Sequence, residues 1–356
     1  MNRRLFLRTI AASAAAGVAG GGVRARAEGE PGRIGIGQIG IGHSHAAGKM
    51  EAVRSLPGTF EVVGVAESDA ALRGAAEGNP AYAGLPWLDE AALLGNPDVR
   101  VVAIETQMRD ACAAAARAIR AGKHVHLDKP GGFEHAAFRD MRLDADRRGL
   151  TVQMGYMLRY NPAFELLFRA AREGWFGQIT EVDCMMGKLA AADMRREMQD
   201  YPSGGMFELA CHLVDAVVTI LGRPAEVHAF STPTRDDGVK DNQLAVLVYP
   251  RVAATIRCNH ADPFGSPRRC FTVSGTKGTI EIRQLESGRV RLFLTEPCGG
   301  YPAGEQALTL PVPQSRYAAE FADLARAVRG EKKLAWDAAH DVAVHEAALR
   351  AGGAWR

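Results

Sequence analysis

Apolar residues in the first part of the chain gather in short runs separated by amphipathic stretches. Four runs have the length and composition of buried strands, and they lie at 33–39, 61–66, 100–105 and 124–127. Helical patterns fall between them, at 45–56, 69–77 and 109–122. Strands and helices that alternate over short connections predict a parallel sheet with helices on both faces. We assign this α/β domain, of the Rossmann type, to residues 31–152.

The pattern changes from residue 178 onward, where strand-like runs follow one another with Gly/Pro turns between them. These runs lie at 179–187, 225–233, 243–250, 252–260 and 270–283. Two helical patterns, at 316–330 and 337–353, finish the chain. A chain of 356 residues is too long for one ordinary core. We therefore expect a second domain of the α+β class at residues 153–356.

The glycines near the end of the first strand indicate where a dinucleotide would bind. A literal G-x-G-x-x-G spacing is formed by Gly35, Gly37 and Gly40, but the first two lie within the strand. The dinucleotide fingerprint needs its first glycine at the strand end and its second where the backbone meets the pyrophosphate. The segment Gly40-Ile41-Gly42 meets this requirement. We predict that these three residues bind the cofactor, with His45 in the place of the usual third glycine.

An acidic residue at the end of the second strand is the next signal of a Rossmann domain. Glu67 stands there, where a carboxylate would bind the adenosine ribose hydroxyls. No arginine follows directly, as a 2′-phosphate would favour, so NAD is expected rather than NADP. His43 and His45, with Ser44, are predicted to approach the pyrophosphate or the substrate. The alternative is that these polar residues cap the following helix.

The first 27 residues have the features of an export signal. Arg3 and Arg4 precede an apolar pair and a weakly apolar Ala/Gly segment, and 25–27 is an A-x-A cleavage site. The apolar run is too short to span a bilayer. We expect a cleaved twin-arginine signal and a periplasmic or secreted protein. That route exports folded proteins, so a cofactor could leave the cytoplasm inside the chain.

The overall composition narrows the class of partner. Hydrophobic residues make up 47% and charged residues 24%, as in soluble globular proteins, and the formal net charge is +2. This balance gives no reason to expect nucleic acid or an anionic membrane. The six cysteines show no C-x-x-C spacing, and neither cysteines nor carboxylates are spaced to complete a metal site with histidines 43, 45, 124 and 126. No metal is expected.

Several segments in order along the mature chain resemble the glucose–fructose oxidoreductase / inositol dehydrogenase (Gfo/Idh/MocA) family. They are "AGKHVHLDKP" (121–130), "VQMGYMLRYNPAF" (152–164), "GGMFELACHLVD" (204–215) and "SGTKGTIEI" (274–282). The resemblance implies a Rossmann domain followed by an α+β domain on a large, mostly antiparallel sheet. It also implies a dimer or tetramer formed through that sheet.

The resemblance places the chemistry on a lysine and a histidine. Lys129 would lie beside the nicotinamide ribose and the substrate hydroxyl. His212 would be the general acid/base, because its reference pKa lies near neutrality. Glu208 stands four positions earlier and would share a helix face with His212, which it would orient or tune. The family usually has Asp at that position. Asp215 is a further candidate, for the substrate or for the other ring nitrogen of His212.

Other family positions are carried over with substitutions. Thr106 and Gln107 occupy a loop that usually reads T-P-N and contacts the cofactor, and Asp128 replaces the Glu of E-K-P. Arg159 and Tyr160 match positions that line the nicotinamide pocket, on the cofactor and substrate sides respectively.

These observations favour an NAD(P)-dependent oxidoreductase that acts on a sugar, a cyclitol or a related polyhydroxy compound. Free NAD is scarce outside the cytoplasm, so an exported enzyme of this kind would keep its nucleotide tightly bound. One alternative is an NAD-dependent glycosidase that oxidises a ring hydroxyl, eliminates the glycoside, adds water and reduces the ring again. A second alternative is a non-catalytic protein that binds nucleotide or sugar.

Overall fold

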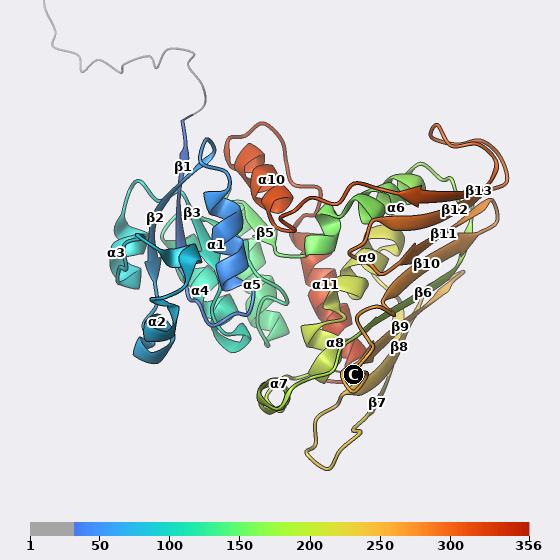
Figure 1. Cartoon of the computed structure of the whole chain (residues 1–356), viewed down its shortest axis with the longest axis horizontal. Helices are drawn as coiled ribbons and strands as arrows, with labels where there is room; N and C mark the ends of the chain where they lie inside the picture. The colour runs from blue at the N-terminus through green and yellow to red at the C-terminus, as the bar shows by residue number, and fades with distance from the viewer. Residues whose placement is uncertain (1–31, 356) are drawn as a thin grey trace, which may run out of the picture. The chain divides into compact units, whose positions relative to one another are not determined.

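Five parallel strands form the first sheet of the described chain, residues 32–355 of a computed structural model (Figure 1). They are β1 (Ile34–Ile39), β2 (Phe60–Ala66), β3 (Val101–Ile104), β4 (His124–Leu127) and β5 (Val152–Met154). Their order is β2-β1-β3-β4-β5, so the connections diverge between β1 and β3. Open α/β sheets bind ligands at such a switch point, outside the carboxyl ends of the strands.

Helices connect these strands, three of them at the predicted positions, whereas those at 90–95 and 135–147 were not predicted. They are α1 (Ala46–Arg54), α2 (Ala70–Ala76), α3 (Glu90–Gly95), α4 (Met108–Arg120), α5 (His135–Arg147) and the short 3₁₀ turn η1 (Pro80–Tyr82). β1 and β3 are buried at every position, as expected for strands covered on both faces. The sheet includes β5, which ends two residues beyond the predicted domain boundary at 152. The predicted signal at 1–27 lies outside the described residues.

The second sheet has eight strands in the order β13-β12-β11-β10-β6-β9-β8-β7. Their bounds are β6 (Ile179–Gly187), β7 (Glu226–Thr232), β8 (Asn242–Val248), β9 (Ala253–Asn259), β10 (Cys270–Gly275), β11 (Gly278–Arg283), β12 (Arg289–Leu294) and β13 (Gly304–Thr309). Every neighbouring pair is antiparallel except β6 and β9, which run parallel. The large, mostly antiparallel sheet is confirmed, although β12 and β13 were not predicted as strands.

Helices pack against one face of this sheet. The remaining helical elements are η2 (Met157–Tyr160), α6 (Pro162–Arg172), α7 (Ala192–Met198), α8 (Gly204–Glu208), α9 (Cys211–Leu221), α10 (Ala318–Val328) and α11 (Ala338–Ala351). α9 contacts β6 and β9, and α11 contacts β7, β8 and also α5 of the first domain. Burial alternates along β8, as expected for a sheet with one covered face.

The cysteines and the helix lengths bear on disulfide formation and on membrane insertion. All six cysteines are free thiols, and four of them are buried. Among the described residues, no helix combines the length and the apolar character needed to cross a membrane.

Candidate active site

A cleft lies at the carboxyl ends of β1, β2 and β3. Its volume is about 410 Å³, and its lining includes Gly40, Gly42, Glu67, Thr106 and Gln107. These five residues were all predicted to contact the cofactor, and the fold brings them together at the switch point. Ser44, which lies two residues after Gly42 and was also a predicted site residue, is exposed.

The loop after β1 has the shape that a dinucleotide needs. Gly40 directly follows the strand with φ of +82°, and a Cβ there would lie 2.6 Å from the backbone of Thr106. A Cβ on Gly42 would lie 3.0 Å from the side chain of Gln107. Gly35 and Gly37 lie inside β1, so the chain turns at Gly40, as the sequence indicates. The cradle and the adjacent cleft fit the backbone approach of a nucleotide pyrophosphate.

Glu67 closes the far side of this loop. Its carboxylate accepts hydrogen bonds from the backbone N–H of Ile41 at 3.0 Å and from that of Asp69 at 2.8 Å. Glu67 therefore fixes the glycine loop as well as lining the cleft. Its contact with a ribose stays a prediction.

Lys129 follows β4, and its peptide bond to Pro130 is cis. The side chain is 3% exposed, and Nζ donates a hydrogen bond to the backbone carbonyl of Glu208 at 2.8 Å. Nζ also lies 3.6 Å from Oε1 of Glu208. Burial opposes the charge of Lys129, but Glu208 and neighbouring acidic groups outweigh it and raise the pKa of this lysine. Lys129 is thus a permanent cation and hydrogen-bond donor rather than a base.

Glu208 and His212 do not share a helix, contrary to the prediction. α8 ends at Glu208, Leu209 and Ala210 form a turn, and α9 begins at Cys211. The Glu208 carboxylate instead contacts the ammonium of Lys188 at 3.0 Å and Nε2 of His260 at 3.0 Å. Burial alone would raise the pKa of Glu208, but Lys129, His260 and Lys188 hold it well below its usual range. Glu208 is a buried carboxylate that gathers cations rather than the partner of His212.

Lys188 and His260 were missed by sequence reasoning. They come directly after β6 and β9, whose parallel register pairs Gly187 with Asn259. Parallel strands bring their carboxyl ends to the same edge, so the two side chains meet at Glu208. A polar residue after each predicted strand was a visible signal, but the parallel pairing in a mostly antiparallel sheet was not.

His212 lies at the start of α9 and is 2% exposed. Its ring meets the ring of Tyr156 edge-on, with the centroids 5.7 Å apart. Nδ1 is buried without a hydrogen-bond partner among the described residues. Burial, followed by the charge of Lys129, lowers the pKa of His212 well below its ordinary value. The imidazole is therefore neutral at neutral pH and has a ring nitrogen free to accept a proton.

Asp215 does not hold the other ring nitrogen of His212, as one hypothesis proposed. It accepts hydrogen bonds from the guanidinium of Arg159 at 2.7 Å and from Nε2 of His340 at 3.0 Å. Arg159 also binds Asp341 at 2.8 Å. Because these groups are buried and satisfy one another, they form an internal ion-pair network. Roles for Arg159 in cofactor binding and for Asp215 in substrate binding stay predictions without support from these contacts.

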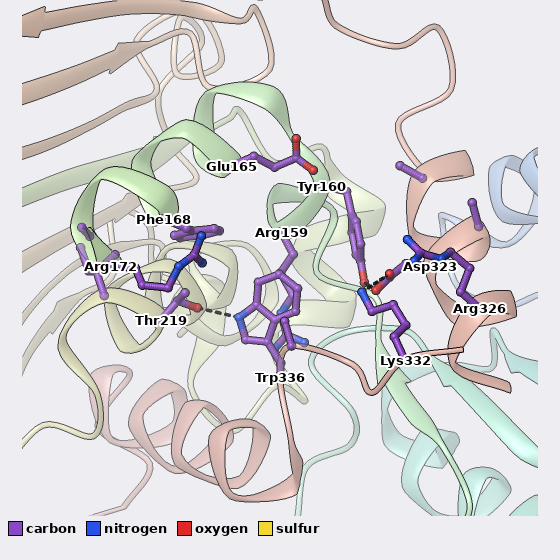
Figure 2. A pocket seen from close by; sticks show the side chains of 15 residues that line it. Arg159, Tyr160, Glu165, Phe168, Arg172, Thr219, Asp323, Arg326, Lys332 and Trp336 are labelled. Atoms are coloured by element: carbon purple, nitrogen blue, oxygen red, sulfur yellow. Dashed lines mark hydrogen bonds and ion pairs between the residues drawn. The ribbon is translucent and has the colours of Figure 1, made fainter. Parts of the chain in front are cut away.

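Tyr160 lines a separate cavity of about 790 Å³, shown in Figure 2. Its hydroxyl donates to Asp323 at 3.0 Å, and Lys332 binds the other oxygen of that carboxylate at 2.5 Å. Trp336 lies across the cavity and donates to Thr219 (Figure 2). Lys129, Glu208 and His212 are not among the lining residues of this cavity. Substrate contact by Tyr160 remains a prediction.

His43 and His45 both turn toward Asp128. His45 is the residue before α1, but its side chain makes no capping bond and instead places Nδ1 3.0 Å from Asp128. His43 is buried and accepts the backbone N–H of His45 on Nδ1 at 3.2 Å. The capping alternative is therefore wrong for the side chain of His45. His126, in contrast, is fully buried between Lys49 and Gln153, which agrees with the structural role expected for it.

A dinucleotide cradle at the switch point, with a buried lysine and a neutral imidazole nearby, defines a class: an oxidoreductase built on an NAD-binding Rossmann fold. The comparisons with known proteins agree. Residues 32–156 match the model of the oxidoreductase family with an NAD-binding Rossmann fold, and residues 164–281 match the GFO/IDH/MocA C-terminal domain. The chain belongs to the Gfo/Idh/MocA family.

Curated relatives are similar over part of their length. The chain is 28% identical over 193 residues to the trans-1,2-dihydrobenzene-1,2-diol dehydrogenase of Bos taurus, covering 53% of this chain and 56% of that protein. It is 29% identical over 196 residues to the uncharacterized oxidoreductase YhhX of Escherichia coli K12, covering 54% and 55%. The chain thus spans about half the length of these relatives.

Solved structures share the fold over most of the chain. The crystal structure of YhhX superposes with a TM-score of 0.74 at 21% identity, covering 89% of this chain and 96% of that one. The WlbA dehydrogenase of Bordetella pertussis, in complex with NADH and UDP-GlcNAcA, gives a TM-score of 0.73 at 17% identity, covering 90% and 97%. At these identities the likeness supports the two-domain architecture.

Proposed function

We propose that this protein transfers hydride between a secondary alcohol carbon of a sugar, cyclitol or related polyhydroxy compound and a tightly held NAD. The observation that carries the proposal is a buried, charged Lys129 after β4 that lies near enough to the buried His212 for its charge to lower the pKa of that imidazole. Oxidation of an alcohol needs one group that takes the hydroxyl proton and one that stabilises negative charge on the oxygen.

His212 takes the proton in this proposal. The alcohol carbon loses a hydride, the hydroxyl loses its proton to the imidazole, and a carbonyl remains. The lowered pKa keeps the imidazole unprotonated at neutral pH, so that a ring nitrogen can act as the acceptor. In the reverse direction the imidazolium returns the proton to the oxygen.

Lys129 orients the hydroxyl and stabilises the charge that develops on its oxygen. One of its three N–H groups is used by the carbonyl of Glu208, so others remain for a substrate. Glu208 keeps the lysine charged from 3.6 Å, and is itself held by Lys188 and His260. Glu208 therefore acts through Lys129 as a positioning residue.

The nucleotide would be held by Gly40, Ile41 and Gly42 at its pyrophosphate and by Glu67 at its ribose. When bound, NAD supplies the hydride acceptor. A carboxylate in this position favours a free ribose hydroxyl over a 2′-phosphate, which supports NAD rather than NADP.

Two relatives support the substrate class. One is named for a cyclic trans-diol and another was crystallised with a nucleotide sugar, UDP-GlcNAcA. Both compounds carry hydroxyls on a ring. We further propose export by the twin-arginine route and assembly into a dimer or tetramer, on the basis of the N-terminal sequence and the resemblance to the family.

The first experiment uses full-length protein purified without added nucleotide. Denaturation releases whatever nucleotide is held, which is then identified and counted. About one NAD per chain is expected if the enzyme works with a resident cofactor. An empty chain that still binds NAD would indicate an ordinary exchanging dehydrogenase, and a chain that binds none would refute the proposal.

The second experiment measures turnover on a panel of sugars and cyclitols, alone and in oxidant–reductant pairs. Lys129→Met should lose about 100-fold or more in kcat while it still binds NAD, since one preorganised donor to a developing oxyanion is worth that much. The matched control is Lys277→Met, which removes an exposed lysine that pairs with Glu296. Equal activity in the two variants would contradict the role of Lys129.

A glycosidase that uses transient oxidation is the second candidate. Glu208 and His260 lie 3.0 Å apart and provide a second carboxylate and imidazole besides His212; elimination beside a carbonyl needs such a second base, and simple hydride transfer does not. Release of an alcohol from a glycoside with no net change in nicotinamide would favour this reaction.

A further inference from the structure

Three side chains with metal-binding atoms meet at the carboxyl ends of β1 and β4. His43 and His45 come from the loop after β1, and Asp128 directly follows β4. Nδ1 of His43 lies 3.3 Å from Oδ2 of Asp128, and Nδ1 of His45 lies 3.0 Å from the same oxygen. One donor atom of each residue lies within 4.8 Å of the other two.

This spacing is that of ligands around a small cation. In a tetrahedral zinc site with bonds of about 2.0–2.1 Å, neighbouring ligand atoms lie roughly 3.3 Å apart. Imidazole nitrogen and carboxylate oxygen are both ligands for zinc and its first-row neighbours. The distance from each imidazole nitrogen to Asp128 therefore fits a shared ion as well as a hydrogen bond.

A fourth group supplies an independent observation. Glu105 follows β3, the strand between β1 and β4, and its side chain is fully buried. Both of its carboxylate oxygens lack a hydrogen-bond partner among the described residues, and Oε2 lies 3.9 Å from Nδ1 of His43. A buried carboxyl group with no donor is costly, and here either a nearby cation or a proton shared with Asp128 would relieve that cost.

Two contacts compete with an ion at this position. The backbone N–H of His45 uses the lone pair on Nδ1 of His43, which a metal would take over. The ammonium of Lys49 lies 3.9 Å from Asp128, but Glu320 neutralises it from 2.6 Å. Asp128 thus remains as the carboxylate nearest to the proposed ion.

We propose that His43, His45 and Asp128 bind a divalent transition-metal ion of the zinc class, with Glu105 the nearest further carboxyl group, 3.9 Å from Nδ1 of His43. The side chain of His45 is 20% exposed and gives the ion a path from solvent. The expectation of no metal relied on spacing along the chain, which does not show that Asp128 meets the loop after β1. The proposal rests on this geometry and does not depend on the hydride transfer proposed above.

The position defines what such an ion would do. Asp128 precedes Lys129, so the ion would lie beside the group that we expect to hold the reacting hydroxyl. A cation there would act as a Lewis acid or as an anchor for an oxygen ligand. In either role the ion and the nucleotide cleft would lie next to each other at the carboxyl ends of the strands.

The test measures metal binding by the full-length protein, with no turnover required. The chain is freed of metal by chelation and titrated with Co²⁺, whose visible d–d absorption reports coordination number, and Zn²⁺ is then added in competition. Residues 1–31 contain neither histidine nor cysteine, so they contribute no such ligand. Wild-type protein should bind one Co²⁺ per chain with the intense absorption of a four-coordinate site, and Zn²⁺ should displace it.

Variants locate the site. His45→Asn and His43→Asn should each bind Co²⁺ at least about tenfold more weakly. Tenfold is roughly the lower end of the loss seen when a residue that only supports a metal ligand is changed, so the loss of a ligand should be no smaller. The control is His135→Asn, because His135 and His345 form another close histidine pair, with Nδ1 atoms 3.3 Å apart. Weak octahedral absorption in the wild type, or equal affinities in His45→Asn and His135→Asn, would overturn the proposal. If a variant misfolds, the coordination number reported by the wild-type spectrum still tests the proposed site.

Discussion

The change Glu208→Gln tests whether one buried carboxylate holds the cations of the candidate site. Glu208 is 5% exposed and faces Lys129 at 3.6 Å, Lys188 at 3.0 Å and His260 at 3.0 Å. Glutamine keeps the size of the side chain but removes its charge. Lys129, which is 3% exposed, would then be a buried ammonium without its main counter-charge.

The magnitude follows from these distances. At an effective dielectric constant of about 20, a pair of unit charges 3.6 Å apart interacts by roughly 4–5 kcal/mol. Relaxation and water entry reduce this, and breaking one side of a buried ion pair typically costs about 3–5 kcal/mol. We expect Glu208→Gln to lower the free energy of unfolding by about 3 kcal/mol at pH 7.

The dependence on pH gives a second readout. The pKa of Glu208 is lower in the folded chain than in the unfolded one, so its contribution is fully present above the unfolded value of about 4.3. It is lost as the pH falls through the folded pKa. The difference between wild type and Glu208→Gln should therefore be large at pH 7 and shrink in acid.

The assay is urea unfolding followed by both circular dichroism and tryptophan fluorescence. The control is Glu305→Gln, which removes an exposed partner of Arg291 and should change stability by less than about 1 kcal/mol. Equal losses in the two variants would refute the view that Glu208 neutralises buried charge. Adding Lys188→Met to Glu208→Gln should recover part of the loss, because one stranded cation is removed.

Two further expectations concern the nucleotide loop and the base. Gly40→Ala should weaken NAD binding and lower stability together, because φ is +82° and the new Cβ would lie 2.6 Å from Thr106. The control is Gly58→Ala, since Gly58 has open space around it. Equal NAD affinity in the two variants would contradict the view that the loop at Gly40 binds the nucleotide. The acid limb of kcat/KM should lie well below pH 6.5, since His212 becomes protonated, and inactive as a base, only below its lowered pKa. A limb at or above pH 6.5 would point to another base.

The first domain was largely predictable, because its signals are local. Buried apolar runs and the turn at Gly40 placed β1 to β4 within about two residues of their ends. The strands β12 and β13 were missed, although β12 alternates charged and apolar residues as a strand with one covered face does. β13, at the edge of the sheet, carries few apolar residues and is recognised as a strand only by its pairing with β12.

The sequence named candidate residues for the site but did not predict the contacts among them. Lys129 and Glu208 do meet, whereas the expected pairing of Glu208 with His212 fails at the turn between α8 and α9. Lys188 and His260 lie 72 positions apart, and only the parallel register of β6 and β9 joins them. No periodicity within either segment encodes such a long-range pairing.

The turn at Leu209 and Ala210 leaves the backbone carbonyl of Glu208 free to bind Lys129. In a continuous helix the carbonyl of Glu208 would accept the backbone N–H of His212; here that N–H lies 3.5 Å from the carbonyl of Leu209, and Lys129 binds the freed oxygen. Leucine and alanine are strong helix formers, so the interruption opposes their local preference. We expect the helical conformation of an excised peptide covering 203–222 to continue through Leu209 and Ala210 without the interruption. The acceptor for the lysine is thus a property of the assembled tertiary structure, absent from the segment that carries it.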